Sequence, residues 1–246
     1  MRITDRIHLV GSGRVGFDLT DAFDCHVYLL DGGGEYALID SGAGRDVGQI
    51  LDHVRDDGLD PNRIRHILLT HAHADHSGGA AALRERLDVT IAASAEAAAM
   101  VRSGDERTLS LDVARRAGAY PDDYRYTASA VDLELAEGDR YQVGDLNLEV
   151  IATPGHSSDQ IAFVLRREGT VSVFAGDALF EGGKILLQDI WNCSVQASCR
   201  SVEKLHALKM DGFYPGHRGF SVTRGLKHPE AAMRNIRHLL PPDQMT

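Results

Sequence analysis

The stretch "LLTHAHADHSGG", residues 68–79, determines how the rest of the chain is interpreted. It carries four side chains of metal-binding type: His71, His73, Asp75 and His76. Residues two apart share one face of an extended segment but not of a helix, so His71 and His73 can leave the end of a strand together. One histidine alone would indicate a solvated loop. Three imidazoles and a carboxylate so close together indicate a metal site.

Apolar runs and glycine breakers around this stretch predict strands that alternate with helices. The apolar run 64–70 predicts a buried strand, which is followed by a helix over 77–87 and a strand over 88–93. Further strands are expected at 6–10, 26–31, 35–40, 146–153, 160–167, 170–176 and 212–214, and further helices over 44–58, 195–208 and 229–239. The pattern predicts an α/β fold with sheets covered by helices.

Residues 94–127 differ in character, being rich first in Ala and then in Arg, and they predict two or three helices. We expect a helical insert that forms a lid, the surface of a homodimer or a structural cover over a sheet edge. No repeat or Pro/Ser-rich linker interrupts the chain, so residues 1–246 are expected to form a single domain.

The overall composition excludes several classes of function. The formal net charge is −10, and an acidic surface repels phosphate backbones, so no nucleic acid partner is expected. The three cysteines, Cys25, Cys193 and Cys199, form no CxxC pair, which favours a cytoplasmic protein over one built on disulfides. No apolar run is long enough for a signal peptide or a membrane span, so no membrane association is expected.

Three later positions share one local pattern. His156 in "ATPGHSSD", Asp177 in "VFAGDALF" and His217 in "FYPGHRGF" each follow an apolar strand and a glycine. Each alone would be an ordinary turn residue. Because ligand sites of α/β sheets lie at the carboxyl ends of strands, the three together with the first stretch predict a set of metal ligands facing one cleft.

The motifs THAHADH (70–76), TPGH (153–156), GD (176–177) and PGH (215–217) resemble those of the metallo-β-lactamase superfamily, and the resemblance runs from residue 38 to residue 217. It implies a four-layer αββα sandwich of two mixed sheets. It also implies two metal ions: a first held by His71, His73 and His156, a second held by Asp75, His76 and His217, with Asp177 bridging both. Asp40 in "LIDSG" matches a carboxylate that orients the histidine loop, although a residue at a helix N-terminus is an alternative interpretation.

The resemblance implies a metal-dependent hydrolase. A hydroxide bridging two divalent metal ions would cleave an ester, thioester, lactone or lactam bond of a small molecule, with Asp75 orienting the hydroxide and passing on its proton. Imidazole and carboxylate ligands favour zinc, with iron and manganese as alternatives. Two other enzymatic functions stay open: a mononuclear-iron oxidoreductase similar to persulfide dioxygenases, and a phosphodiesterase. A binding protein that kept the fold is a third alternative.

The sequence narrows the substrate only in part. "GDALFEGG" (176–183) resembles glyoxalase II, a thioesterase with a long helical C-terminal domain, but only 29 residues (246 − 217) follow His217, so a glutathione thioester is not expected. Acyl-homoserine lactonases resemble this chain in size but carry a Tyr near the position of Phe180, which weakens the assignment to that class of enzyme. We expect substrate contacts from Phe180, Lys184, Trp191 and Asn192; the alternative is that Trp191 belongs to the core and Lys184 is solvated.

Overall fold

The computed structural model describes residues 1–245, and the chain forms two compact units. The first unit is Met1–Leu135 with Val143–Asp145, and the second is Ala136–Gln142 with Leu146–Thr246. A single domain stays a prediction. Every helix among residues 1–245 is too short or too polar to span a bilayer.

The first unit contains a mixed sheet in the order β1-β2-β3-β4-β5-β6. The first three strands pair antiparallel, and β3 to β6 run parallel to one another. The strands expected at 26–31 and 35–40 form an antiparallel hairpin. The strands are β1 (Ile7–Gly11), β2 (Val27–Asp31), β3 (Tyr36–Ile39), β4 (Ile64–Leu68), β5 (Thr90–Ser94) and β6 (Leu133–Leu135).

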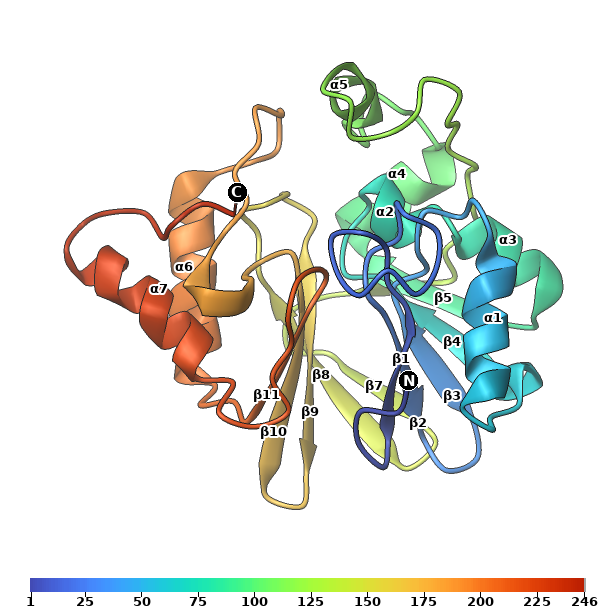
Figure 1. Cartoon of the computed structure of the whole chain (residues 1–246). Coiled ribbons are helices and arrows are strands. Elements are labelled where there is room, and N and C mark those ends of the chain that lie inside the picture. The colour runs from blue at the N-terminus through green and yellow to red at the C-terminus, as the bar shows by residue number, and fades with distance from the viewer. Residues whose placement is uncertain (246) are drawn as a thin grey trace. The chain divides into compact units, whose positions relative to one another are not determined.

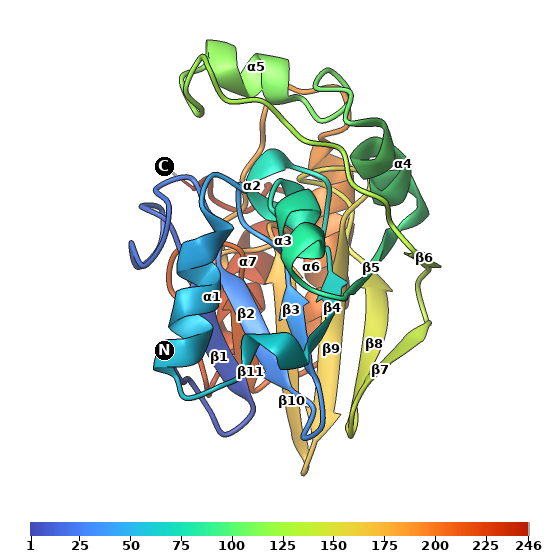
Figure 2. The same ribbon diagram turned by 90° about the vertical axis from the view of Figure 1, so that its right-hand side faces the viewer.

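Helices cover this sheet because each carries an apolar face. In α1 (Val47–Asp56) the apolar residues Val47, Ile50, Leu51 and Val54 are all buried. The helix begins at Asp46, whose side chain accepts a hydrogen bond from the backbone N–H of Gly48. Figures 1 and 2 show α1 and α3 on the same face of the sheet, with α5 beyond the strand ends. The other helices of this unit are α2 (Ala74–Ser77), α3 (Ala80–Arg86), α4 (Ala95–Ser103), α5 (Leu111–Arg116) and the 3₁₀ turn η1 (Pro61–Arg63).

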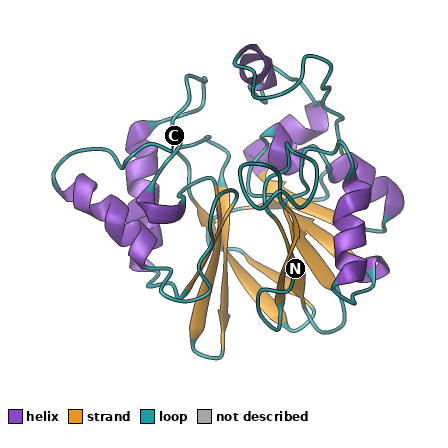
Figure 3. Ribbon diagram, in the orientation of Figure 1, coloured by secondary structure: helices purple, strands orange, loops and turns teal. Residues whose placement is uncertain are grey.

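The second unit contains a sheet in the order β11-β10-β9-β8-β7, with α6 and α7 on one face (Figure 3). The pairs β8/β9 and β9/β10 are antiparallel, and β10/β11 is parallel. Glu168 and Gly169, both at positive φ, form the two-residue turn between β9 and β10. The elements are β7 (Arg140–Val143), β8 (Leu146–Ala152), β9 (Ile161–Arg167), β10 (Thr170–Gly176), β11 (Gly212–Pro215), α6 (Val195–Ala207), α7 (Lys227–Arg237) and the 3₁₀ turn η2 (Glu181–Gly183).

The strand directions gather the candidate ligands of each unit at one edge of its sheet. In the first unit β3 and β4 are parallel, so Asp40 and the loop that begins at Leu69 leave the same edge, and the backbone N–H of Asp40 donates to the carbonyl of Leu68 at 3.0 Å. In the second unit β8, β10 and β11 run in one direction, so the segments after them, which contain the three later candidates, also share an edge.

The structure differs from the expected elements in two places. The helix expected over 77–87 is divided into α2 and α3, which meet at Gly78 and Gly79. The strands β6 and β7 were not predicted. Two helices, α4 and α5, occupy the expected insert at 94–127, and buried residues of α4 belong to the apolar core of the first unit.

Candidate metal centre

Asp40 holds the loop after β4 through three hydrogen bonds. Its Oδ1 accepts from the backbone N–H of Thr70 at 2.7 Å, and its Oδ2 accepts from Thr70 Oγ1 and from His76 Nδ1, both at 2.9 Å. The side chain is buried, and burial raises the pKa of the carboxyl against the lowering effect of His76 and Thr70. Asp40 has a φ of +64°, a strained backbone conformation that clusters at functional sites.

This network assigns the tautomers of two histidines. A carboxylate only accepts hydrogen bonds, so the proton of His76 lies on Nδ1 and Nε2 keeps its lone pair. The one hydroxyl hydrogen of Thr70 goes to Asp40, so Thr70 Oγ1 accepts from His71 Nδ1, which lies 3.0 Å away. His71 and His76 therefore both present Nε2 in the state that binds a cation.

The four candidates of the first stretch lie together. The ring centroid of His71 is 4.7 Å from that of His73 and 4.0 Å from that of His76. His76 Nε2 lies 3.5 Å from Asp75 Oδ2. The rings of His71 and His76 are fully buried.

The backbone explains why glycines follow this stretch. The N–H and the hydroxyl of Ser41 both donate to the carbonyl of His76 at 2.8 Å, and the N–H of Gly79 donates to the carbonyl of Gly42 at 2.9 Å. A Cβ at position 79 would lie 2.0 Å from the carbonyl oxygen of Ser41. Only glycine lets the two loops approach this closely.

The second unit brings its three candidates together around one oxygen. Asp177 Oδ2 lies 3.5 Å from His156 Nε2 and 3.6 Å from His217 Nε2. His156 Nδ1 lies 3.1 Å from the carbonyl oxygen of Leu186, to which it donates, so Nε2 of this ring also keeps its lone pair. All three side chains are buried.

Helix α6 supports the turn that carries His156. The N–H of Ser194 donates to the carbonyl of Gly155 at 2.8 Å, and Ser201 Oγ donates to the carbonyl of Pro154 at 2.6 Å. Gly155 has a φ of +148°, and a Cβ there would lie 2.3 Å from Ser198 Oγ. These serines carry no pattern in the sequence; the Pro-Gly pair before His156 was the one local signal of a close approach.

The donor atoms fit divalent cations in both spacing and chemistry. An N–H···O hydrogen bond spans about 2.7–3.2 Å, whereas two ligands of a tetrahedral zinc ion, each about 2.0–2.1 Å from it, lie about 3.3–3.4 Å apart. The three imidazole–carboxylate separations of 3.5–3.6 Å are closer to the second value. At Asp177, two imidazole nitrogens approach one carboxylate oxygen at this spacing.

A third cluster consists of Cys25, Asp40 and His76, whose donor atoms lie within 4.8 Å of one another. Burial raises the pKa of the Cys25 thiol, so this sulfur is held as the neutral thiol rather than as the thiolate that binds metals. Asp40 already accepts three hydrogen bonds. We therefore assign this cluster to the support of His76 and not to a separate cation.

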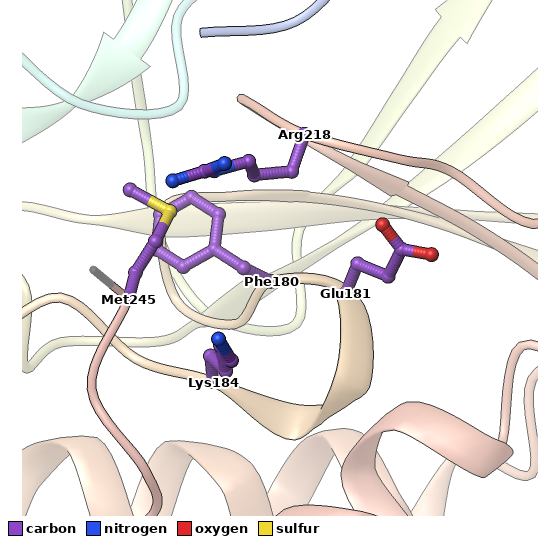
Figure 4. Close-up of a pocket in the computed structure, with 5 residues that line it drawn as sticks. All are labelled: Phe180, Glu181, Lys184, Arg218 and Met245. Carbon is purple, nitrogen blue, oxygen red and sulfur yellow. The ribbon is translucent and has the colours of Figure 1, made fainter.

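Two of the four expected substrate contacts line a pocket of about 280 Å³ in the second unit. Phe180 and Lys184 line it together with Glu181, Arg218 and Met245, and Figure 4 shows the ring of Phe180 between the side chains of Arg218 and Lys184. The ring centroid of Phe180 is 6.3 Å from that of the neighbouring candidate His217. Arg218 was not among the residues predicted from the sequence, although it directly follows a candidate ligand.

The other two expected contacts lie outside this pocket lining. Trp191 is 62% exposed, so the alternative that it belongs to the core is wrong. Asn192 is buried. The role of both residues in substrate binding stays a prediction.

Tyrosines of the segment after α5 contact the first stretch, which the sequence did not indicate. Tyr120 forms hydrogen bonds with Asp75, and the hydroxyl of Tyr126 lies 2.8 Å from Ser77 Oγ. Burial raises the pKa of Tyr120 well above its ordinary value, and the negative charge of Asp75 acts in the same direction. The phenol is therefore the neutral, donating form.

Comparison with known proteins agrees with this arrangement. The family model described as "Metallo-beta-lactamase superfamily" matches residues 20–220. A hydroxyacylglutathione hydrolase of Methylococcus capsulatus is 28% identical over 187 residues, which are 75% of this chain and 58% of that protein. One of Cereibacter sphaeroides is 34% identical over 149 residues, 61% of this chain and 46% of that protein. The chain thus spans about half the length of these curated relatives.

Solved structures show the same fold. A subclass B3 metallo-beta-lactamase of Bradyrhizobium japonicum has a TM-score of 0.74 at 21% identity, covering 97% of this chain and 91% of its own. A metallo-beta-lactamase of Legionella gormanii has a TM-score of 0.72 at 20% identity, covering 97% and 94%. The predicted fold class, the α/β sandwich with αββα layers, is confirmed.

Proposed function

Because the chain belongs to the metallo-β-lactamase superfamily, we propose that it is a metal-dependent hydrolase that cleaves a thioester or ester bond of a small anionic molecule. The observation that carries the proposal is the set of imidazole and carboxylate atoms, held in each unit at the spacing of ligands that share a cation. The names of the hydroxyacylglutathione hydrolases support a thioester as the first choice of bond.

We propose that the two ligand sets act together as the family pattern implies. His71, His73 and His156 would hold one cation, and Asp75, His76 and His217 a second, with Asp177 bridging them. Zinc is the first choice because all seven donors are imidazole nitrogens or carboxylate oxygens, and iron and manganese accept the same donors. When bound, two such cations lower the pKa of water to near 7 and polarise a carbonyl.

Asp75 is the proposed proton carrier. Its Oδ1 accepts a hydrogen bond from Tyr120, whereas its Oδ2 is the oxygen that faces His76. A carboxylate within reach of the attacking water can accept its proton and pass it to the leaving sulfur or oxygen. The buried histidines around Asp75 exclude water from its surroundings, so the proton passes between Asp75 and the reacting groups rather than to solvent.

Charge in the pocket of the second unit supports an anionic substrate. Lys184 and Arg218 contribute two positive charges and Glu181 one negative charge, which leaves an excess of one positive charge. The ring of Phe180, which is fully buried, lies between the two cations. We propose that a carboxylate of the substrate binds to Lys184 and Arg218.

The test is hydrolysis with and without metal. Protein stripped with a chelator, then reconstituted with zinc, iron(II) or manganese(II), is assayed on carboxylate-bearing thioesters, lactones, β-lactams and phosphodiesters, with oxygen uptake recorded in parallel. We expect hydrolysis only after reconstitution and fastest on the thioesters. A His71→Ala/His156→Ala double variant should be inactive, while His238→Ala, a change at an exposed histidine outside the ligand set, should match the wild type. Unchanged hydrolysis by the stripped protein or by the double variant contradicts the proposal, and oxygen uptake with one bound iron identifies the oxidoreductase instead.

A further inference from the structure

Tyr120 makes two hydrogen bonds to a single residue, Asp75. The phenol donates to Asp75 Oδ1 at 2.8 Å and accepts from the backbone N–H of Asp75 at 3.0 Å. A phenol has one proton to donate and lone pairs to accept with, so both bonds can form at once. The two residues are 45 positions apart in the chain.

This pair of bonds fixes the carboxylate of Asp75. The backbone N–H lies in the first turn of α2, where N–H groups have no partner inside the helix, and no side chain caps this helix at His73. Tyr120 supplies that partner and, with the same oxygen, binds Oδ1. The rotation of the carboxylate is thereby set so that Oδ2 faces His76 Nε2 at 3.5 Å.

Tyr120 is itself held by stacked rings. Its ring centroid is 5.1 Å from that of Tyr124, at an interplanar angle of 20°, and 5.9 Å from that of Phe23. The hydroxyl of Tyr124 donates to the carbonyl of Ala43 at 2.7 Å. Because two neighbouring rings restrain it, the phenol can impose its position on Asp75 rather than follow it.

We infer that Tyr120 is a positioning residue for Asp75, which selects the carboxylate oxygen that the second cation meets; this inference rests on the proposed function. It also gives the segment 94–127 a role other than a lid or an interface, because this segment supplies Tyr120, whose hydroxyl orients the proposed metal ligand Asp75. Tyr120 itself does not contact the reacting atoms. Its effect passes through the orientation of Asp75.

Cation binding by Tyr120→Phe tests the inference. Phenylalanine keeps the stacked ring and removes only the hydroxyl. Zinc binding to the stripped protein is measured by competition with a chromophoric chelator, and the visible spectrum of the cobalt(II) form reports the geometry of each cation. We expect the second cation to bind about tenfold more weakly, with the first unchanged. Tyr36→Phe, which removes a hydroxyl from a buried tyrosine in the same unit that packs under Arg63, should bind both cations as the wild type does.

A second variant separates positioning from general support of the fold. In an Asp75→Ala background there is no carboxylate to orient, so Tyr120→Phe should weaken binding of the second cation no further. Equal losses in both backgrounds, or wild-type affinity and spectrum in Tyr120→Phe, overturn the inference while the proposed function stands. A wild-type protein that binds no second cation overturns the proposed function, and the inference with it.

Discussion

Replacing Asp40 by Asn changes one atom in a network that sets two histidine tautomers. Asp40 accepts from the N–H of Thr70, the hydroxyl of Thr70 and Nδ1 of His76. The amide oxygen of Asn can still accept from the N–H of Thr70, but its NH₂ group stands where Oδ2 accepted. That group donates to His76 Nδ1 and to Thr70 Oγ1, so the proton of His76 moves to Nε2.

The reversal continues to His71. Once Thr70 Oγ1 accepts from the amide, its own hydrogen is available to His71 Nδ1, which places the proton of His71 on Nε2 as well. The number of hydrogen bonds is kept, so the fold should persist. Each histidine must give up one reversed bond, about 1–2 kcal/mol, before it can bind a cation, which corresponds to about 5- to 30-fold weaker binding at each of the two cations.

The assay is zinc competition with a chelator on metal-free protein, together with circular dichroism and thermal unfolding to show that the variant is folded. Asp57→Asn is a matched control, because Asp57 is paired with a histidine of the same unit, accepting from His8 Nδ1 at 2.7 Å. We expect the control to bind zinc as the wild type does. A folded Asp40→Asn protein with wild-type affinity for both cations would refute the tautomer argument.

Two further predictions concern the second unit. Lys184→Met and Arg218→Met should each raise KM for a carboxylate-bearing thioester about tenfold with kcat little changed, because each removes a contact made equally in the ground and transition states. Steady-state kinetics on the acid and on its methyl ester measure this effect. Equal increases in KM on both substrates would contradict the prediction. His228 accepts from the N–H of Gly182 at 3.0 Å and lies 2.9 Å from Ser221 Oγ, and burial lowers its pKa from 6.5 to about 4. The unfolded chain therefore takes up this proton first, so the stabilisation is complete above pH 6.5 and is lost as the pH falls towards 4, by about 2 kcal/mol at pH 5. Thermal unfolding from pH 7 to 4.5 should show a shallower decline in His228→Gln, and identical profiles would exclude this origin.

The sequence was most informative where local pattern and ligand chemistry coincide. The strands that carry candidate ligands have strong apolar runs and end in glycine or a short turn, and each is found within two residues of its expected position. The short strands β6 and β7 lack such runs. Strand β6 has only three residues, and β7 begins with Arg140 and alternates exposed and buried residues. They are recognisable as strands only through their partners.

The contacts of Tyr120 and Arg218 were not predictable for a different reason. Tyr120 lies in a segment without periodicity, and its partner Asp75 is 45 residues away. Arg218 has no motif of its own, and only the fold places it beside Lys184. Ligand positions, and Asp40 in "LIDSG", carry a signature of residue type and spacing, whereas Tyr120 and Arg218 are placed only by three-dimensional contact.

The residues that contact the ligands should affect the binding of the two proposed cations differently. Asp40 acts on His76 directly and on His71 through Thr70, and the family pattern assigns these histidines to different cations, so a change at Asp40 should weaken both. Tyr120 acts on Asp75 alone and should weaken only the second. In the second unit the partner of His156 is a backbone carbonyl, which a side-chain substitution cannot remove. A carbonyl partner makes the imidazole a weaker metal ligand than a carboxylate partner does. Comparing Asp40→Asn with Tyr120→Phe therefore tests the assignment of His71 to one cation and of His76 and Asp75 to the other: if both variants weaken the same single cation, that assignment fails even though each residue supports binding.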